Sequence, residues 1–165
     1  MKKILGLLAI LLSLIACSTS KTSEKKAATA RMVYGQVMDS LNSSSYTILL
    51  DYVTPRRMKP QFLTSGYRVK IDGDTITSFL PYFGVAYRAD FNGRDRSPLD
   101  FRAPILSYKS EQVKQDYFRI KLSTRHEMEI ITYQIEVFAN GKATLDVISS
   151  DREGISFSGN INLAE

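Results

Sequence analysis

The stretch Glu127–Ser149, EMEIITYQIEVFANGKATLDVIS, indicates most clearly how this 165-residue chain folds. Apolar and polar residues alternate along it up to Phe138, and they alternate again from Ala143. A period of two is typical of a half-buried β-strand. Between the two runs stands Asn140-Gly141, a dipeptide that favours two-residue hairpin turns because both residues tolerate a positive φ. The stretch therefore predicts two antiparallel strands joined by a tight turn.

The same pattern of short alternating runs and turns continues through most of the chain. Asp72-Gly73 stands between an alternating run that begins at Tyr67 and one that ends at Leu80, which predicts a second hairpin. Short connections of this kind force neighbouring strands to be antiparallel. Further strands are predicted at Tyr46–Val53, Gly84–Arg88, Leu99–Tyr108 with a break at Pro104, Tyr117–Ser123 and Ile155–Leu163, with turns at Asn92–Asp95 and Asp151–Gly154.

One helix is predicted ahead of the strands, from about Ser23 to Leu41. Ala30, Val33, Val37 and Leu41 recur at spacings of three and four, which places them in one apolar stripe. The sequence thus predicts an α+β fold that is mainly β. We expect about eight strands in an antiparallel meander, curled or barrel-like, with the N-terminal helix covering part of one face.

The N-terminus carries the pattern of a secretory signal. Two lysines are followed by a short apolar run from Ile4 to Ala16, which is too short to span a bilayer comfortably. Cys17 follows directly after Leu14-Ile15-Ala16, and this placement resembles the bacterial lipobox. We therefore expect a lipoprotein signal peptide at 1–16, a lipidated flexible tether at 17–22 and a single domain at 23–165.

A lipobox implies that the Cys17 thiol receives a diacylglycerol and that fatty acids such as palmitate anchor the mature protein. Two or three acyl chains give firm anchoring, whereas one gives only reversible binding. The residue after the cysteine is Ser18 and not aspartate, so it does not resemble an inner-membrane retention signal. The expected location is the bacterial outer membrane, facing the periplasm, with the membrane as a partner through Cys17.

Composition narrows the chemistry further. The net charge of +5 is small and spread along the chain, which argues against a nucleic-acid partner. Cys17 is the only cysteine and His126 the only histidine. Neither a disulfide within the chain nor a conventional zinc site is therefore expected. We expect no cofactor, and the remaining partner is an unknown protein or small molecule.

No group of residues predicts catalysis, so we expect a protein that is not an enzyme. His126 lies between two predicted strands and is interpreted as an exposed turn residue. Glu127 and Glu129 share a face of a regular strand, but alternating charge is typical of a strand that faces solvent. Asp72-Gly73-Asp74 supplies too few oxygens for calcium and is interpreted as a hairpin turn. No catalytic and no metal-binding residues are assigned.

The remaining candidate is the aromatic segment Phe79–Tyr87, FLPYFGVAY. Aromatic side chains on a rigid turn can form the edge of a ligand site, although they can equally belong to the core. Phe83 lacks a polar atom and is assigned to the core, whereas Tyr82 is expected at the surface with a solvated hydroxyl. The candidate ligand or partner surface consists of Tyr82, Tyr87 and Arg88.

Three short sequences also resemble a known family. They are the aromatic segment after the Asp72-Gly73-Asp74 hairpin, the tripeptide Leu99-Asp100-Phe101 and the run Ile155–Gly159. Together they resemble the domain-of-unknown-function family DUF4251, along nearly the whole chain after the signal. The resemblance implies an exported lipoprotein of Bacteroides-like gut bacteria and assigns no activity.

The expected function is that of a cell-envelope lipoprotein that acts as a non-enzymatic binding or envelope-maintenance module. Two alternatives stay open: a carrier of a small apolar ligand inside a curled sheet, and a carboxylate-dependent hydrolase.

Overall fold

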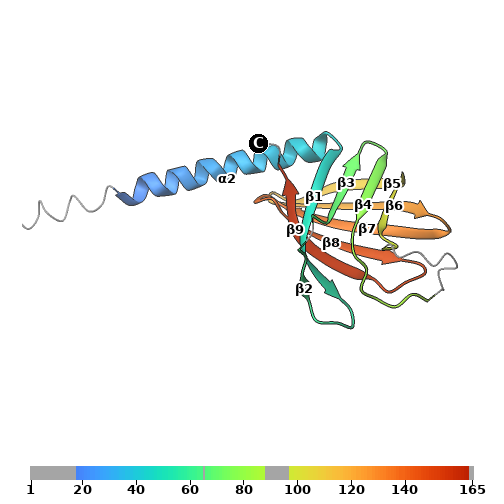
Figure 1. The fold of residues 1–165 in the computed structure, drawn as a ribbon. Coiled ribbons are helices and arrows are strands. Elements are labelled where there is room, and N and C mark those ends of the chain that lie inside the picture. Colours follow the sequence, from blue (N-terminus) through green and yellow to red (C-terminus); the bar gives the residue numbers. More distant parts are fainter. Residues whose placement is uncertain (1–17, 65, 88–96, 164–165) are drawn as a thin grey trace, which may run out of the picture.

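The computed structural model of the chain describes residues 18–64, 66–87 and 97–163. One helix, α2 (Ser18–Asn42), precedes nine strands (Figure 1). The strands are β1 (Ser45–Pro55), β2 (Gln61–Phe62), β3 (Arg68–Asp72), β4 (Thr75–Phe79), β5 (Asp100–Lys114), β6 (Tyr117–His126), β7 (Glu129–Phe138), β8 (Lys142–Ser149) and β9 (Ile155–Asn162).

The strands form a closed antiparallel barrel. Each strand from β3 to β8 pairs with the next one along the chain, and β1 pairs with β3 on one side and with β9 on the other. Eight strands therefore close the barrel, and the short β2 adds an extra strand beside the end of β1. The predicted antiparallel meander, curled or barrel-like, is confirmed, and the structure adds that the sheet closes.

Period-two alternation explains why these segments become barrel strands. In β7, the side chains of Ile131, Tyr133, Ile135 and Val137 are fully buried, and the residues between them are only partly covered. The same alternation in β6 and β8 places aliphatic side chains inside the barrel and charged ones outside. Removing this apolar surface from water is the main force that holds the sheet in its closed form.

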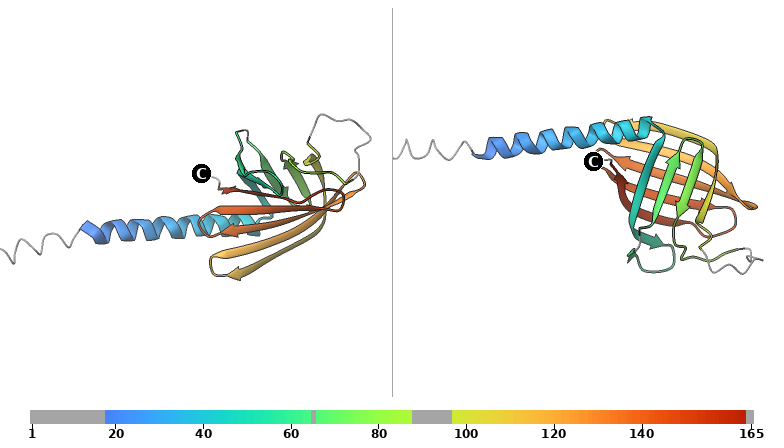
Figure 2. Two further views of the ribbon diagram at one scale, coloured as in Figure 1. Left: turned by 90° about the horizontal axis from the view of Figure 1, so that it is seen from below. Right: turned by 45° about the horizontal axis from the view of Figure 1, so that its top comes forward.

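Helix α2 covers one end of the barrel with its C-terminal half. Val37 and Leu41 are buried there, and the Tyr34 ring lies 6.4 Å from the ring of Phe118. The N-terminal half extends away from the barrel (Figures 1 and 2). The helix begins at Ser18, five residues earlier than predicted, so the expected flexible tether is helical from that residue onward. Within the described residues, no helix has the length and apolar character needed to cross a bilayer.

Two strand predictions need correction. Strand β5 runs unbroken through Pro104 and continues to Lys114, because Pro104 faces Thr75, the first residue of β4, where the β4–β5 ladder ends. A proline nitrogen has no proton to donate, and at this position none is required. The strand predicted at Gly84–Arg88 is reduced to a single bridge at Ala86, and Arg88 and the turn predicted at 92–95 lie outside the described residues.

Candidate functional site

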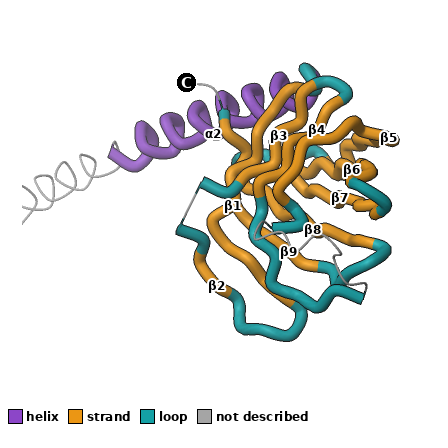
Figure 3. The backbone as a smooth tube through the Cα atoms, turned by 45° about the vertical axis from the view of Figure 1, so that its right-hand side comes forward, coloured by secondary structure: helices purple, strands orange, loops and turns teal. Residues whose placement is uncertain are grey.

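The end of the barrel opposite α2 collects the longer loops and the buried charges of the described chain (Figure 3). The β8–β9 turn contacts the β1–β2 loop, the segment 80–87 and the start of β7 there. Glu129, Arg152 and Glu153 are 6%, 8% and 7% exposed, and they are the buried charged residues among those described. Burying a charge is costly unless the charge is paired, so their partners determine what this end can do.

Glu129 forms a buried ion pair with Arg152. The Nε atom of Arg152 lies 3.0 Å from both carboxylate oxygens of Glu129, and the Ser149 hydroxyl donates a hydrogen bond to the same carboxylate. The prediction that Glu129 faces solvent is wrong, because Glu129 is in phase with the inward-facing Ile131 of the same strand. Glu127 has a φ of 56° in the preceding turn, so the two glutamates do not share a strand face.

The aromatic segment lies alongside the β8–β9 turn. Backbone contacts join the segment to that turn. They hold both segments in place, although neither is part of a barrel strand. The contacts are the bridge from Ala86 to Arg152, the Tyr87 N–H donated to the Asp151 carbonyl at 2.8 Å, and the Glu153 N–H donated to the Val85 carbonyl at 3.0 Å. These contacts bring Tyr82 and Tyr87 to the buried charges.

Tyr82 is tied to this turn by its hydroxyl and by its ring. The hydroxyl lies 2.9 Å from the Glu153 carbonyl and 3.1 Å from the Val85 carbonyl, and the Arg152 guanidinium lies 5.6 Å from the ring centroid. Burial raises the pKa of Tyr82, and the positive charge of Arg152 partly offsets the rise. A Cβ atom on Gly84 would lie 2.6 Å from the Tyr82 hydroxyl, so a larger residue there would displace the Tyr82 ring from this position.

The Tyr82 hydroxyl, expected to be solvated, lies within hydrogen-bond distance of two backbone carbonyls and remains partly exposed. Tyr82 and Phe83 are both half-buried, and both pack against the core. The sequence did not reveal these contacts, because one of the two carbonyls belongs to a turn about seventy residues further along the chain.

Glu153 is covered from outside by an exposed arginine. Arg57 Nε lies 2.9 Å from Glu153 Oε1, and the side chains of Arg57 and Glu153 are 70% and 7% exposed. The second carboxylate oxygen, Oε2, is buried and has no hydrogen-bond partner among the described residues. A buried acceptor without a donor is costly, so this oxygen is a point where a bound donor would stabilise the protein.

A second polar group without a partner lies deeper in the barrel. The Tyr133 hydroxyl is fully buried and makes no hydrogen bond to any described residue, while the nearby Ser78 hydroxyl donates to the Leu99 carbonyl at 2.7 Å. Burial raises the pKa of Tyr133; Ser78 lowers it somewhat, and the charge of Glu129 adds to the rise. The interior towards this end is thus more polar than the apolar half beneath α2.

The raised pKa values of Tyr46, Tyr82 and Tyr133 predict a loss of stability in alkali. All three are raised above 10.0, chiefly by burial, so the unfolded chain releases these protons first. We expect the free energy of unfolding to be insensitive to these groups below pH 10 and to fall as the pH rises above that value. Urea unfolding between pH 7 and pH 11 measures this.

Tyr133→Phe is the matched variant for that titration. It removes a buried hydroxyl that has no described partner, so stability at pH 7 should be unchanged or higher. Above pH 10, the free energy of unfolding of this variant should fall less steeply with rising pH than that of the parent. A steeper decline, or a clear loss at pH 7, would show that the hydroxyl has a stabilising partner.

The other candidates from the sequence are not arranged for catalysis or metal binding in the described part of the chain. His126 is the last residue of β6 and stacks on Phe101 with a centroid distance of 4.4 Å and an interplanar angle of 6°. It is half-buried, and the interpretation as an exposed turn residue is wrong. Among the residues with described positions, no three His, Cys, Asp or Glu side chains converge as metal ligands would.

Sequence reasoning located part of this end of the barrel. Tyr82 lies beside the buried charges and Tyr87 is 63% exposed next to them, whereas Arg88 and Cys17 lie outside the described residues. It placed Glu129 on a solvent-facing strand, and it did not identify the contacts that join Glu129 to Arg152 and Glu153 to Arg57. The available signal was a carboxylate at an inward-facing position of β7, in phase with isoleucine and tyrosine.

Comparisons with known proteins agree with this fold. The family described as "Domain of unknown function (DUF4251)" matches residues 28–161. A crystal structure of a DUF4251 family protein from Bacteroides eggerthii DSM 20697 at 1.95 Å resolution is similar, with a TM-score of 0.61 and 14% identity. The similarity covers 80% of this chain and 88% of that one. None of the curated proteins matches the chain.

Proposed function

This chain belongs to the DUF4251 family, and we propose that it is a lipid-anchored, non-enzymatic binding module of the bacterial cell envelope. Acyl chains on Cys17 would hold it in the outer membrane, facing the periplasm. The end of the barrel opposite α2 would receive a protein or small-molecule partner beside Tyr82, Tyr87 and the neighbouring Arg88.

The observation that carries this proposal is the position of α2. The helix begins at the residue after Cys17, has 25 residues and is exposed on all sides from Ser23 to Met32. At 1.5 Å per residue it is about 37 Å long. A helix of this kind supports a role as a spacer, because it would separate the barrel from the lipid-anchored Cys17 by most of its length.

Binding is better supported than catalysis at this end. Arg152 contacts both carboxylate oxygens of Glu129, and Arg57 pairs with Glu153 through Oε1, so each carboxylate already has a cationic partner. Binding on the loops is also better supported than an apolar cargo inside the barrel. The interior of an eight-stranded barrel can be filled by side chains or can hold one small ligand, so the side chains inside it decide between the two. Here large residues such as Tyr133, Ile71 and Leu122 occupy the interior.

The anchor is tested by the intact mass of the protein purified from a bacterial host. We expect a chain that begins at Cys17 and carries acyl chains, and Cys17→Ser should leave the protein unacylated and uncleaved. A parent protein that retains Met1, or an unmodified Cys17 at its N-terminus, contradicts the anchor.

The binding role is tested by native mass spectrometry of the same preparation, which would reveal a co-purified ligand. Hydrolysis of glycan or ester substrates that disappears in Glu153→Gln would instead establish an enzyme.

A further inference from the structure

The segment Arg56–Phe62, RRMKPQF, combines basic and apolar side chains that the proposed binding role leaves unexplained. It comprises the β1–β2 loop and the short strand β2, and we call it the β2 hairpin. Arg56, Arg57 and Lys59 give it three positive charges, and the sequence from Thr54 to Thr64 contains no acidic residue.

The apolar side chains of the β2 hairpin are held outward. Phe62 is 83% exposed and Met58 is 51% exposed. Phe62 pairs with Tyr52 of β1, and the two rings meet edge to face with their centroids 5.0 Å apart. A hydrogen bond from the Leu63 N–H to the Asp51 carbonyl, 2.8 Å long, fixes the following residue. The fold thus presents this aromatic ring to solvent, although exposing apolar surface is unfavourable.

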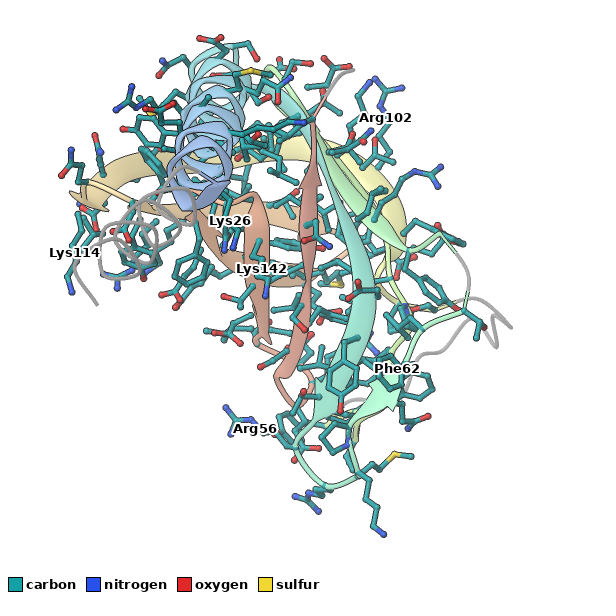
Figure 4. The ribbon with its side chains drawn as sticks, turned by 90° about the vertical axis from the view of Figure 1, so that its left-hand side faces the viewer. Lys26, Arg56, Phe62, Arg102, Lys114 and Lys142 are labelled. Atoms are coloured by element: carbon teal, nitrogen blue, oxygen red, sulfur yellow. The ribbon has the colours of Figure 1, made fainter. Side chains whose placement is uncertain are left out.

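The position of the β2 hairpin relates it to the expected anchor. In Figure 1 the start of α2 and the β2 hairpin are the outermost parts of the described chain on the lower left side. A flat surface seen edge-on in this view, such as that of a bilayer, can therefore contact the start of α2 and the β2 hairpin without passing through the barrel. Figure 4 looks from the left side of Figure 1, and Lys26, Lys142, Arg56 and Phe62 are visible there. Basic residues thus accompany the apolar tip on this side.

We propose that the β2 hairpin is a second membrane contact, in which Met58 and Phe62 enter the headgroup layer and Arg56 and Lys59 face anionic lipids. The inference rests on the proposed lipid anchor, which would bring the barrel to the bilayer surface. Basic residues beside a membrane gain from its negative surface potential, and apolar side chains gain from burial at the interface. An anchor on the same chain raises the effective concentration of the hairpin at the surface, so that a weak contact suffices.

A lipid surface suits the shape of the β2 hairpin better than an acidic protein does. The hairpin projects from the barrel (Figures 1 and 3), and its largest apolar side chain, Phe62, is 83% exposed. A projecting apolar tip flanked by basic residues can enter the headgroup layer as it stands. A protein partner would need a matching hollow to cover the same ring.

The chain contains no tryptophan, which makes a fluorescence test direct. Phe62→Trp in the full acylated chain places a single reporter on the β2 hairpin. The protein is reconstituted into phosphatidylcholine vesicles with or without phosphatidylglycerol. We expect a blue-shifted emission, and quenching by brominated acyl chains, in the anionic vesicles. Met128→Trp is the matched control, because Met128 is 90% exposed on the β6–β7 hairpin, which lies on the opposite side in Figure 1.

Removing two positive charges tests the electrostatic part. Each basic residue near an anionic surface contributes about 1 kcal/mol, and about 1.4 kcal/mol corresponds to a factor of ten. In the Phe62→Trp protein, the further changes Arg56→Gln and Lys59→Gln should therefore lower the equilibrium constant for insertion about thirtyfold at low salt. Arg57 is left in place because it pairs with Glu153.

Two results would overturn the membrane contact. One is an emission of the Phe62→Trp protein that stays water-like and unquenched in anionic vesicles. The other is an emission that shifts only when an acidic peptide is added. The intact mass of the same sample reports the anchor separately: an unacylated protein contradicts the proposed function and removes the premise of this contact, whereas a water-like emission from acylated protein contradicts the hairpin contact alone.

Discussion

Replacing Arg152 by alanine is expected to lower the free energy of unfolding by about 3–5 kcal/mol. Arg152 is 8% exposed, and its Nε contacts both carboxylate oxygens of Glu129, which is itself 6% exposed. Removing the guanidinium leaves Glu129 inside the barrel with the Ser149 hydroxyl as a weaker partner. The loss is large because a buried charge keeps its desolvation cost when its partner is removed.

Urea unfolding at pH 7 measures this loss, and two variants serve as controls. Lys70→Ala removes an ion pair with Asp72 in which both side chains are about half exposed, and it should change stability little. The double variant Glu129→Leu/Arg152→Met removes both charges together and should recover much of the loss, because apolar residues of similar volume can replace a buried pair. If Arg152→Ala were no more harmful than Lys70→Ala, the buried pair would not contribute as described.

The barrel strands were predictable because their evidence is local. The alternation along β7 and the dipeptides Asp72-Gly73 and Asn140-Gly141 specify strands and turns within a few residues of sequence. Gly73 and Gly141 have φ values of +60° and +81°, as these turns require. Barrel closure has no such local signal, because it joins Thr47 to Asn162. A curled meander was therefore as much as the sequence could support.

The candidate site was harder to predict for the same reason. A glutamate in an alternating strand has the same appearance in sequence whether its face is solvated or buried, and only the distant Arg152 makes burial of Glu129 tolerable. Asp151–Gly154 was correctly predicted as a turn, yet its charged side chains were taken as ordinary turn residues. Their roles depend on Tyr82 and Arg57, which come from two other loops.

Gly159→Ala is expected to prevent normal closure of the barrel. It should lower the free energy of unfolding by more than about 4 kcal/mol, which single substitutions do only when they cause a severe structural defect. A Cβ atom at Gly159 would lie 1.9 Å from the Leu49 carbonyl oxygen and 2.8 Å from the Leu50 Cα. Both atoms belong to the backbone of β1, where a register shift follows Leu50 opposite Gly159. A backbone cannot rotate away as a flexible side chain can, so β1 and β9 would have to separate. Glycine in a strand often marks a close backbone approach of this kind.

Thermal and urea unfolding of Gly159→Ala measure the loss, and hydrogen exchange locates it. We expect amides along β1 and β9 to lose protection first, since these strands form the closing pair. Gly35→Ala is the matched control: nothing lies within 4 Å of the added Cβ, and alanine at this helical position should stabilise the protein by up to about 1 kcal/mol. If Gly159→Ala stayed within about 1 kcal/mol of the parent, with β1 and β9 still protected, the close β1–β9 approach would be wrong. Because no connection along the chain holds β1 to β9, this contact alone decides whether the meander closes or remains an open sheet.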